Sequence, residues 1–156
     1  MARVADRLMK EGYDFTVLMI GEINEPQMAD SIKALNNPNI HLLGGKHNPL
    51  EYLQAADAFA LTSSFEGLPI SLIEAMGVGL VPICTPVGGI VNLINDGVNG
   101  FLSKGISEEA YYTALKRYLD TPTEHLNTMK AKALNTYKPF TMVECAKKYE
   151  TLFLTK

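Results

Sequence analysis

The sequence predicts an α/β domain with a Rossmann-like, doubly wound parallel sheet. Short strands that are apolar on both faces alternate with helix-length segments from residue 2 to residue 102, and such strands are typical of parallel sheets covered on both sides. A chain of 156 residues is long enough for one domain with a real core. Hydrophobic residues make up 47% and charged residues 20%, which indicates a folded globular chain rather than a disordered one.

The predicted elements alternate in chain order. The predicted helices of this part cover residues 2–11, 26–35, 49–56, 70–76 and 88–95. The predicted strands cover residues 15–20, 39–43, 58–61, 80–84 and 100–102. Gly12 closes the first helix, and Pro26 suits a first helical turn.

Three more helices form a helical C-terminal part, 107–156, of the same single domain, 1–156. The first is expected to begin at Ser107, with Glu108 and Glu109 in its first turn. The other two cover residues 122–136 and 141–154, and Thr141 is expected to cap the last one. Tyr111, Tyr112, Leu115 and Tyr118 form a helical stripe that indicates core or interdomain packing more than a cofactor site.

The start of the chain departs from the usual order, because a doubly wound nucleotide-binding domain normally opens with a strand and this chain opens with a helix. We therefore expect that a first strand and its loop are missing, either because Met1 is an artificial boundary or because the gene is truncated. The strand edge left unpaired predicts an exposed apolar face beside the first helix and self-association through it.

Charge and composition exclude several classes of protein. The net charge of −3 argues against nucleic acid as a partner. The two cysteines, Cys84 and Cys145, stand alone, which indicates reduced thiols, and Cys84 is expected to be a core residue of a strand. No apolar run reaches the roughly 18 residues that span a bilayer, and residues 1–7 lack a secretory signal. We expect a cytoplasmic protein.

Ligands of open parallel sheets bind at the carboxyl ends of the strands, which selects four loops. These loops are residues 21–22, 44–47, 63–69 and 85–89. None contains a Walker-type phosphate loop, and no G-x-G-x-x-G follows a strand, which argues against a nicotinamide dehydrogenase.

Residues 63–76, SSFEGLPISLIEAM, carry the strongest signal of a site. A turn containing Gly67 leads into a helix, so the amides of residues 67, 68, 70 and 71 are expected to face an anion. Glu66 precedes the helix, and Glu74 leans back towards its ligand end, where a carboxylate suits ribose hydroxyls. An anion site between two hydroxyl-binding acids fits a nucleotide-diphosphate sugar. The alternative is that Glu66 is a capping acid and Glu74 a solvated helix residue.

Glu66 and Glu74 are separated by seven residues, and Gly67-Leu68-Pro69 follows the first acid. This pattern resembles the E-x7-E motif of retaining GT-B glycosyltransferases of the family-4-like type. The resemblance covers residues 15–103 in order. Its other parts are Leu43-Gly44, Asn48-Pro49, Tyr52, the stretch AADAFAL at 55–61, Ala75-Met76, Pro82, Thr85, Val87-Gly88-Gly89, Asn95-Asp96-Gly97 and Asn99-Gly100.

This resemblance implies the C-terminal, donor-binding domain of a GT-B fold. The family transfers a sugar with retention from a UDP-sugar or GDP-sugar, usually without a metal, and no cofactor is expected. Glu66 would be the catalytic residue that contacts the donor sugar, and the segment Gly67, Leu68, Pro69 and Ile70 would hold sugar and diphosphate. Glu74 would bind the ribose, and Gly44 and Gly45 would lie near the base. The leaving diphosphate is thought to guide the acceptor, so the enzyme positions and stabilises charge.

Four residues of the ligand-facing loops are weaker candidates for donor binding, namely Lys46, His47, Ser63 and Gly88. The resemblance implies an Arg and Lys pair that would precede residue 1 and an acceptor domain with a histidine, and we expect both to be missing from this sequence. Lys46 could partly replace that pair, or it could be a solvated lysine. His47 could stack on the base, or it could be a surface histidine. Asn92 stands where many members carry Glu.

Three functions are open at this point. The first is the donor-binding half of a glycosyltransferase, inactive alone and completed by an N-terminal acceptor domain that joins a glycan or lipid-linked acceptor. The second is a sugar-nucleotide epimerase of the same architecture, and the third is a stand-alone nucleotide-sugar-binding or regulatory module. By family analogy the product is a polysaccharide or lipid-linked glycan, and peripheral membrane association of the full enzyme stays open.

Overall fold

The structure is a computed structural model that describes residues 1–154. Its α-helices are α1 (Ala2–Lys10), α2 (Pro26–Lys33), α3 (Pro49–Ala55), α4 (Ile70–Gly77), α5 (Ile90–Leu93), α6 (Glu108–Leu119), α7 (Thr123–Tyr137) and α8 (Met142–Leu154), with a short 3-10 helix η1 (Lys138–Phe140). Its strands are β1 (Val17–Ile20), β2 (Ile40–Gly44), β3 (Ala58–Leu61), β4 (Val81–Cys84) and β5 (Phe101–Leu102). The predicted helical part, 107–156, is described as far as residue 154.

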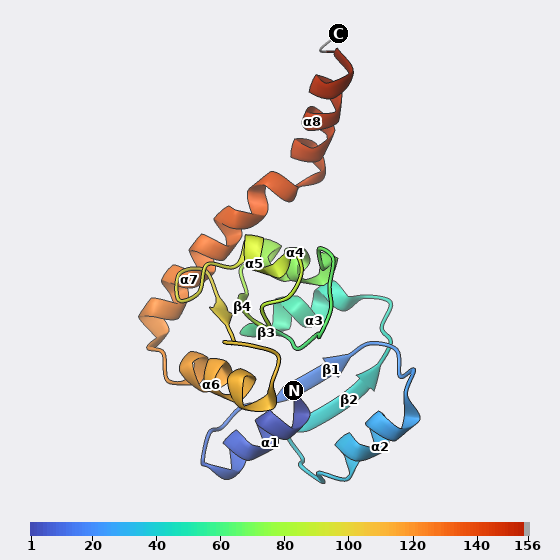
Figure 1. The fold of residues 1–156 in the computed structure, drawn as a ribbon, viewed down its shortest axis with the longest axis vertical. Coiled ribbons are helices and arrows are strands. Elements are labelled where there is room, and N and C mark those ends of the chain that lie inside the picture. The colour runs from blue at the N-terminus through green and yellow to red at the C-terminus, as the bar shows by residue number, and fades with distance from the viewer. Residues whose placement is uncertain (155–156) are drawn as a thin grey trace.

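All strand pairs are parallel, as the sequence predicts, but the strands form two sheets and not one (Figure 1). β1 pairs with β2, and Val17 lies opposite Ile40. The second sheet has the order β3-β4-β5, with Ala58 opposite Val81 and Ile83 opposite Phe101. The Rossmann-like arrangement is interrupted between the two sheets, because β1 and β3 are not hydrogen-bonded neighbours.

β4 forms the centre of the core, and all four of its residues are buried. One cluster of buried side chains joins Val4 and Leu8 of α1 to β4, β5, α6 and α7. A second cluster packs α4, α5 and Ala133 of α7 around Cys84. Helix α7 therefore contributes to both core clusters, through Met129 and Ala133.

Local signals read from the sequence act as predicted. The Ser107 hydroxyl accepts from the Ala110 amide at 3.2 Å, and the Thr141 hydroxyl accepts from the Glu144 amide at 3.3 Å, so both residues cap their helices. Tyr111 is buried and donates to the Ile83 carbonyl at 3.0 Å. The tyrosine stripe of α6 is therefore core packing.

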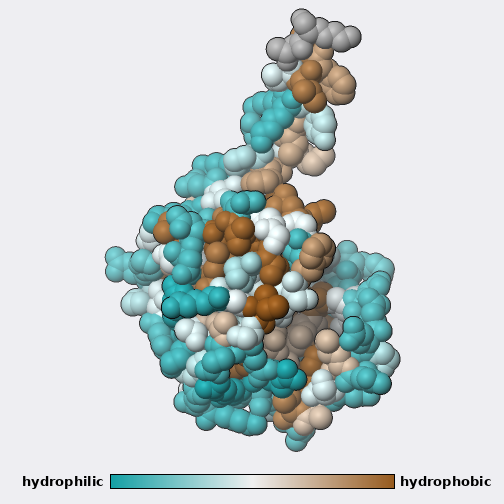
Figure 2. All heavy atoms as spheres, viewed as in Figure 1, coloured by the Kyte–Doolittle hydropathy of each residue, from teal (hydrophilic) through white to brown (hydrophobic). Residues whose placement is uncertain are grey.

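Helix α8 projects away from the rest of the molecule (Figure 1). None of its described residues is buried, and near its end it exposes Leu152, Phe153 and Leu154. Figure 2 shows hydrophobic side chains near the tip of this projection. No helix of the described part of the chain is long and apolar enough to cross a membrane.

Candidate functional site

The Glu66 loop, residues 62–69, joins β3 to α4 and holds Glu66 in a fixed position. The Ser63 hydroxyl donates to the Glu66 Oε1 atom at 2.6 Å, and the Glu66 side chain is half-buried. Ser63 is held in turn, because the buried Thr85 hydroxyl donates to the Ser63 carbonyl at 2.6 Å. A hydroxyl-bound carboxylate is thereby presented at the carboxyl end of β3.

The loop after β4, residues 85–89, packs directly on the Glu66 loop. Gly88 has φ +52°, and a Cβ atom there would lie 1.8 Å from the Glu66 carbonyl oxygen. The Gly89 amide donates to the Gly67 carbonyl at 2.6 Å. Only a residue without a side chain fits at position 88, so Gly88 allows the loop after β4 to pack closely against the backbone of the Glu66 loop.

The backbone of the Glu66 loop leaves amide groups available for a ligand. Within the described residues, the amides of Gly67, Leu68, Ile70 and Ser71 donate to no backbone or side-chain acceptor, whereas the next two amides donate to the Pro69 carbonyl. Pro69 is buried at the N-cap of α4, and residues 67, 68 and 70 are exposed. Free amides at the start of a helix favour an anion such as a diphosphate.

Glu74 lies one turn inside α4 and is exposed. It lines a hollow of about 290 Å³ together with Pro49 and Leu50 of α3, residues 77–78 and Tyr137. The structure therefore brings Glu74 beside the first turn of α3, which directly follows the loop of Gly44 and Gly45. Neither Glu66 nor the free amides line this hollow.

The loop after β2 contains the remaining predicted residues. Gly44 has φ +71° and accepts from the Gly21 amide at 3.2 Å. Gly45, Lys46 and His47 are exposed, and Lys46 forms no ion pair with the described residues. The side chain of Glu22, from the loop after β1, approaches Gly45, so these two loops adjoin.

Two features near the site were not predicted from the sequence: the residues that fix the Glu66 loop, and a second hollow. Thr85 and Gly89, which fix the Glu66 loop, were not among the candidates, although both follow a buried strand. A second hollow, of about 260 Å³, opens between β1, β2 and α2, and Glu22, Ile23 and Met28 are among its lining residues. The only sequence feature that indicated this hollow was Gly21-Glu22, a glycine and an acid directly after a buried strand.

Cys84, the last residue of β4, supplies no nucleophile to the site. Burial, with a smaller effect from the Glu66 charge, raises the pKa of the Cys84 thiol to about 12, so Cys84 stays protonated and is no nucleophile. Within residues 1–154, no three His, Cys, Asp or Glu side chains lie together closely enough to hold a metal ion.

Comparison with known proteins identifies the family. The model of the family described as glycosyl transferases group 1 matches residues 1–136. The chain belongs to this family. The curated proteins that resemble it include an N-acetylgalactosaminyltransferase of Campylobacter jejuni, named for transfer to an N,N'-diacetylbacillosaminyl-diphospho-undecaprenol. That relative is 29% identical over 126 residues, which cover 81% of this chain and 33% of the relative.

A second relative is a glycogen synthase of Pseudomonas putida, 26% identical over 155 residues that cover 96% of this chain and 29% of the relative. The chain thus spans a third or less of the length of these two curated relatives.

Solved structures show the same fold. A Staphylococcus aureus TarM mutant, crystallised in complex with Fondaparinux, alpha-GlcNAc-glycerol and UDP, superposes with a TM-score of 0.84 at 21% identity, over 99% of this chain and 32% of TarM. Anabaena Alr3699/HepE in complex with UDP-glucose gives a TM-score of 0.81 at 21% identity, over 96% of this chain and 44% of HepE. The group 1 chain therefore has the Rossmann-like α/β fold found in GT-B glycosyltransferases.

Proposed function

We propose that this group 1 chain is the donor-binding half of a retaining glycosyltransferase. The enzyme would transfer a sugar from a UDP-sugar or GDP-sugar to a glycan or a lipid-linked acceptor. One observation carries the proposal. The amides of Gly67, Leu68, Ile70 and Ser71 are free beside a carboxylate, Glu66, that Ser63 holds in place. The bound UDP and UDP-glucose of the similar TarM and HepE structures support it.

The diphosphate of the donor is assigned to the free amides. Backbone N–H groups at a helix start stabilise negative charge without a metal ion, and that charge grows on the diphosphate as the sugar leaves. Glu66 cannot bind phosphate, because both are negatively charged, and its carboxylate instead accepts from hydroxyl groups of the donor sugar. Glu66 is accordingly the proposed catalytic residue.

The nucleoside is assigned to the neighbouring loops. Glu74 accepts from the ribose hydroxyls, and its place beside the first turn of α3 agrees with a base that lies near Gly44 and Gly45. Lys46 and His47 are exposed in the same loop, where Lys46 can approach the diphosphate and His47 the base. Binding through these groups involves neither a metal nor another cofactor, so chelation by EDTA is expected to leave donor affinity unchanged.

An acceptor-binding half completes the proposed enzyme. The chain spans a third or less of the two curated relatives described above, and its site is open on the side of the exposed residues Gly67, Leu68 and Ile70. Positioning the acceptor against the donor sugar is then the task of a separate domain.

The proposal is tested by calorimetric titration of the chain with UDP, GDP and their common sugars. We expect saturable binding of one of the two nucleotides, which names the base. Glu74→Ala should weaken it about tenfold or more, since each charge-assisted hydrogen bond contributes about 1.5–3 kcal/mol.

Glu124→Ala is the matched control, because Glu124 is an exposed helical acid in the first turn of α7. This variant should bind like the parent chain. Equal affinity of the parent and Glu74→Ala would contradict the assignment of the ribose, and absence of binding at millimolar nucleotide would contradict the donor site.

A further inference from the structure

The hollow between β1, β2 and α2, here called the α2 hollow, lies outside the donor site assigned above. Its volume is about 260 Å³, and its apolar lining includes Met19 and Ile20 of β1, Leu42 of β2 and Ile32 of α2. Gly21, the residue that directly follows β1, also lines it. The α2 hollow therefore lies at the carboxyl end of β1, the edge at which open parallel sheets bind their ligands.

The size and lining of the α2 hollow suit a single flat ring system. Pockets that take a whole drug-sized ligand have volumes of about 300–1,000 Å³, so this hollow has room for part of a nucleotide. Ile23 and Met28 line it and are 47% and 57% exposed. A nucleobase that packs against them covers this apolar surface, which is favourable in water.

The polar side chains of the α2 hollow are those of Glu22, Asn24 and Glu25. Two of them are carboxylates, which only accept hydrogen bonds, and the third is an amide, which also donates. Neither carboxylate forms an ion pair with the described residues. The α2 hollow therefore favours a ligand edge that carries more than one hydrogen-bond donor.

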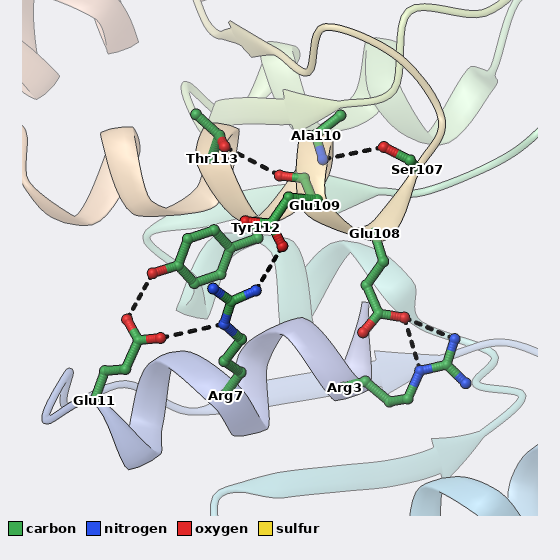
Figure 3. Close-up of polar contacts among 9 residues, drawn as sticks. All are labelled: Arg3, Arg7, Glu11, Ser107, Glu108, Glu109, Ala110, Tyr112 and Thr113. Carbon is green, nitrogen blue, oxygen red and sulfur yellow. Dashed lines mark hydrogen bonds and ion pairs between the residues drawn. The ribbon is translucent and has the colours of Figure 1, made fainter.

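The arginines of helix α1, which lies beside β2, are paired with acids of α6, as Figure 3 shows. Arg3 forms an ion pair with Glu108 at 2.7 Å, and Arg7 forms one with Glu109 at 2.6 Å. These two cations consequently do not neutralise the carboxylates of the α2 hollow.

Helix α1 also joins the sheet of the α2 hollow to the sheet of the Glu66 loop. Val4 and Leu8 of α1 pack in the core cluster that contains Val81 of β4. Asp6, on the same helix, accepts from the Asn37 side chain, in the turn before β2, at 3.0 Å. A ligand that contacts both sheets therefore meets groups that are already held in place, which lowers the cost of binding.

Glu22 connects the α2 hollow to the proposed donor site. Its Cγ atom would lie 3.6 Å from a Cβ atom at Gly45, so the loops after β1 and β2 adjoin. Pro49, which begins α3 after the second of these loops, lines the hollow of Glu74. A nucleoside whose ribose reaches Glu74 and whose base passes Gly45 consequently brings the edge of that base to Glu22.

The two candidate bases differ at one atom of the edge that would meet these side chains. Guanine presents the O6 acceptor, the N1–H donor and the N2 amino donor in order, whereas uracil presents O4, N3–H and O2. The Asn24 amide can donate to the first atom of either base, and Glu22 can accept from the central N–H. The second Glu22 oxygen then accepts from the guanine amino group, but it repels the O2 atom of uracil because both are acceptors.

We propose that the α2 hollow holds guanine and that Glu22 is the specificity-determining residue, so that the donor is a GDP-sugar. This inference rests on the proposed function, because the free amides of the Glu66 loop and Glu74 hold the diphosphate and the ribose. The UDP and UDP-glucose of TarM and HepE belong to proteins 21% identical to this chain. A fold shared at that level leaves the side chains that recognise a base free to differ.

The test is calorimetric titration of the chain with GDP, UDP and inosine diphosphate, which differs from GDP only by lacking the amino group. We expect GDP to bind about tenfold or more tightly than inosine diphosphate, since a charge-assisted hydrogen bond contributes about that factor, and UDP to bind more weakly than either. Glu22→Gln should lower the ratio of the GDP and inosine diphosphate affinities to about twofold. All three nucleotides carry the same charge, so this ratio does not respond to a general change of charge.

Asp30→Asn is the matched control, because Asp30 is an exposed acid of α2 outside the lining of the α2 hollow. It should keep the ratio of the parent chain. An equal ratio in the parent and Glu22→Gln, or a ratio lost in Glu25→Gln alone, would overturn the role of Glu22. UDP bound as tightly as GDP, and still weakened by Glu74→Ala, would overturn this inference and leave the donor site standing, whereas no binding of any of the three nucleotides would contradict both.

Discussion

At the scale of single residues, the contact of two loops determines the shape of the site. Gly88 leaves no space for a side chain, since its Cβ would lie 1.8 Å from the Glu66 carbonyl oxygen, and its φ of +52° disfavours other residues. We expect Gly88→Ala to lower the free energy of unfolding by about 1–3 kcal/mol and to weaken nucleotide binding, because the Glu66 loop must move. Urea denaturation and calorimetric titration measure the two effects.

Gly105→Ala is the control for that substitution, because a Cβ atom at Gly105 meets nothing within 4 Å. Its stability should change by no more than about 0.5 kcal/mol. A Gly88→Ala protein as stable as Gly105→Ala, with unchanged nucleotide affinity, would mean that the contact between the two loops does not shape the site.

The sequence predicted part of this arrangement. The free amides could be predicted because a helix that begins after a glycine turn is visible in the local sequence. In the structure, the amides of residues 67, 68, 70 and 71 donate to no acceptor among the described residues. The hydrogen bond from Thr85 to Ser63 joins residues 22 positions apart. No periodicity or motif reports such a contact, so Thr85 was missed and Gly88 was predicted only as a weaker candidate. The roles of Glu66 and Glu74 towards a ligand stay predictions.

At the scale of elements, most helices and strands were predicted because glycine, proline and capping residues mark their ends. The predicted strand 15–20 is shorter in the structure, Val17–Ile20, since pairing with β2 begins only at Val17. The division into two sheets was not predicted, because each strand shows only its own pattern. Whether β1 and β3 are hydrogen-bonded to each other depends on the tertiary structure, and the residue pattern of either strand carries no information about it.

Asp6 links two elements, and its pKa makes the link sensitive to acid. Hydrogen bonds, first from Asn37 and then from Lys10, hold the pKa of the Asp6 carboxyl below its ordinary value of 3.8. A lowered pKa in the folded state stabilises the protein above pH 3.8, and this contribution is lost as the pH falls through the folded-state pKa. We therefore expect the free energy of unfolding to fall below about pH 4, and to fall less steeply in Asp6→Asn.

Urea denaturation between pH 6 and pH 2.5 measures this dependence. Glu124→Gln serves as the control, because Glu124 is exposed and its side chain has no hydrogen bond or ion pair that the structure records. Its pH dependence should match that of the parent chain. Parallel curves for Asp6→Asn and the parent would show that Asp6 does not contribute to the loss of stability in acid.

At the scale of the whole molecule, the chain carries a candidate donor site and covers 33% and 29% of its two curated relatives. We expect it to bind nucleotide without catalysing sugar transfer, because in the proposed enzyme a separate domain binds the acceptor. The measurement is release of free UDP or GDP from the bound sugar nucleotide, with and without glycan or lipid-linked acceptors. Acceptor-dependent release by the chain alone would contradict this expectation.

The projecting helix α8 carries Cys145, which is half-buried, whereas Cys84 is fully buried and its thiol has a pKa of about 12. Maleimides and iodoacetamides react with the thiolate, so at neutral pH they modify Cys145 and leave Cys84 intact. The unaltered chain thus accepts a single fluorophore or spin label at the base of α8. A change in the emission or mobility of that label would then show that another protein domain binds to α8.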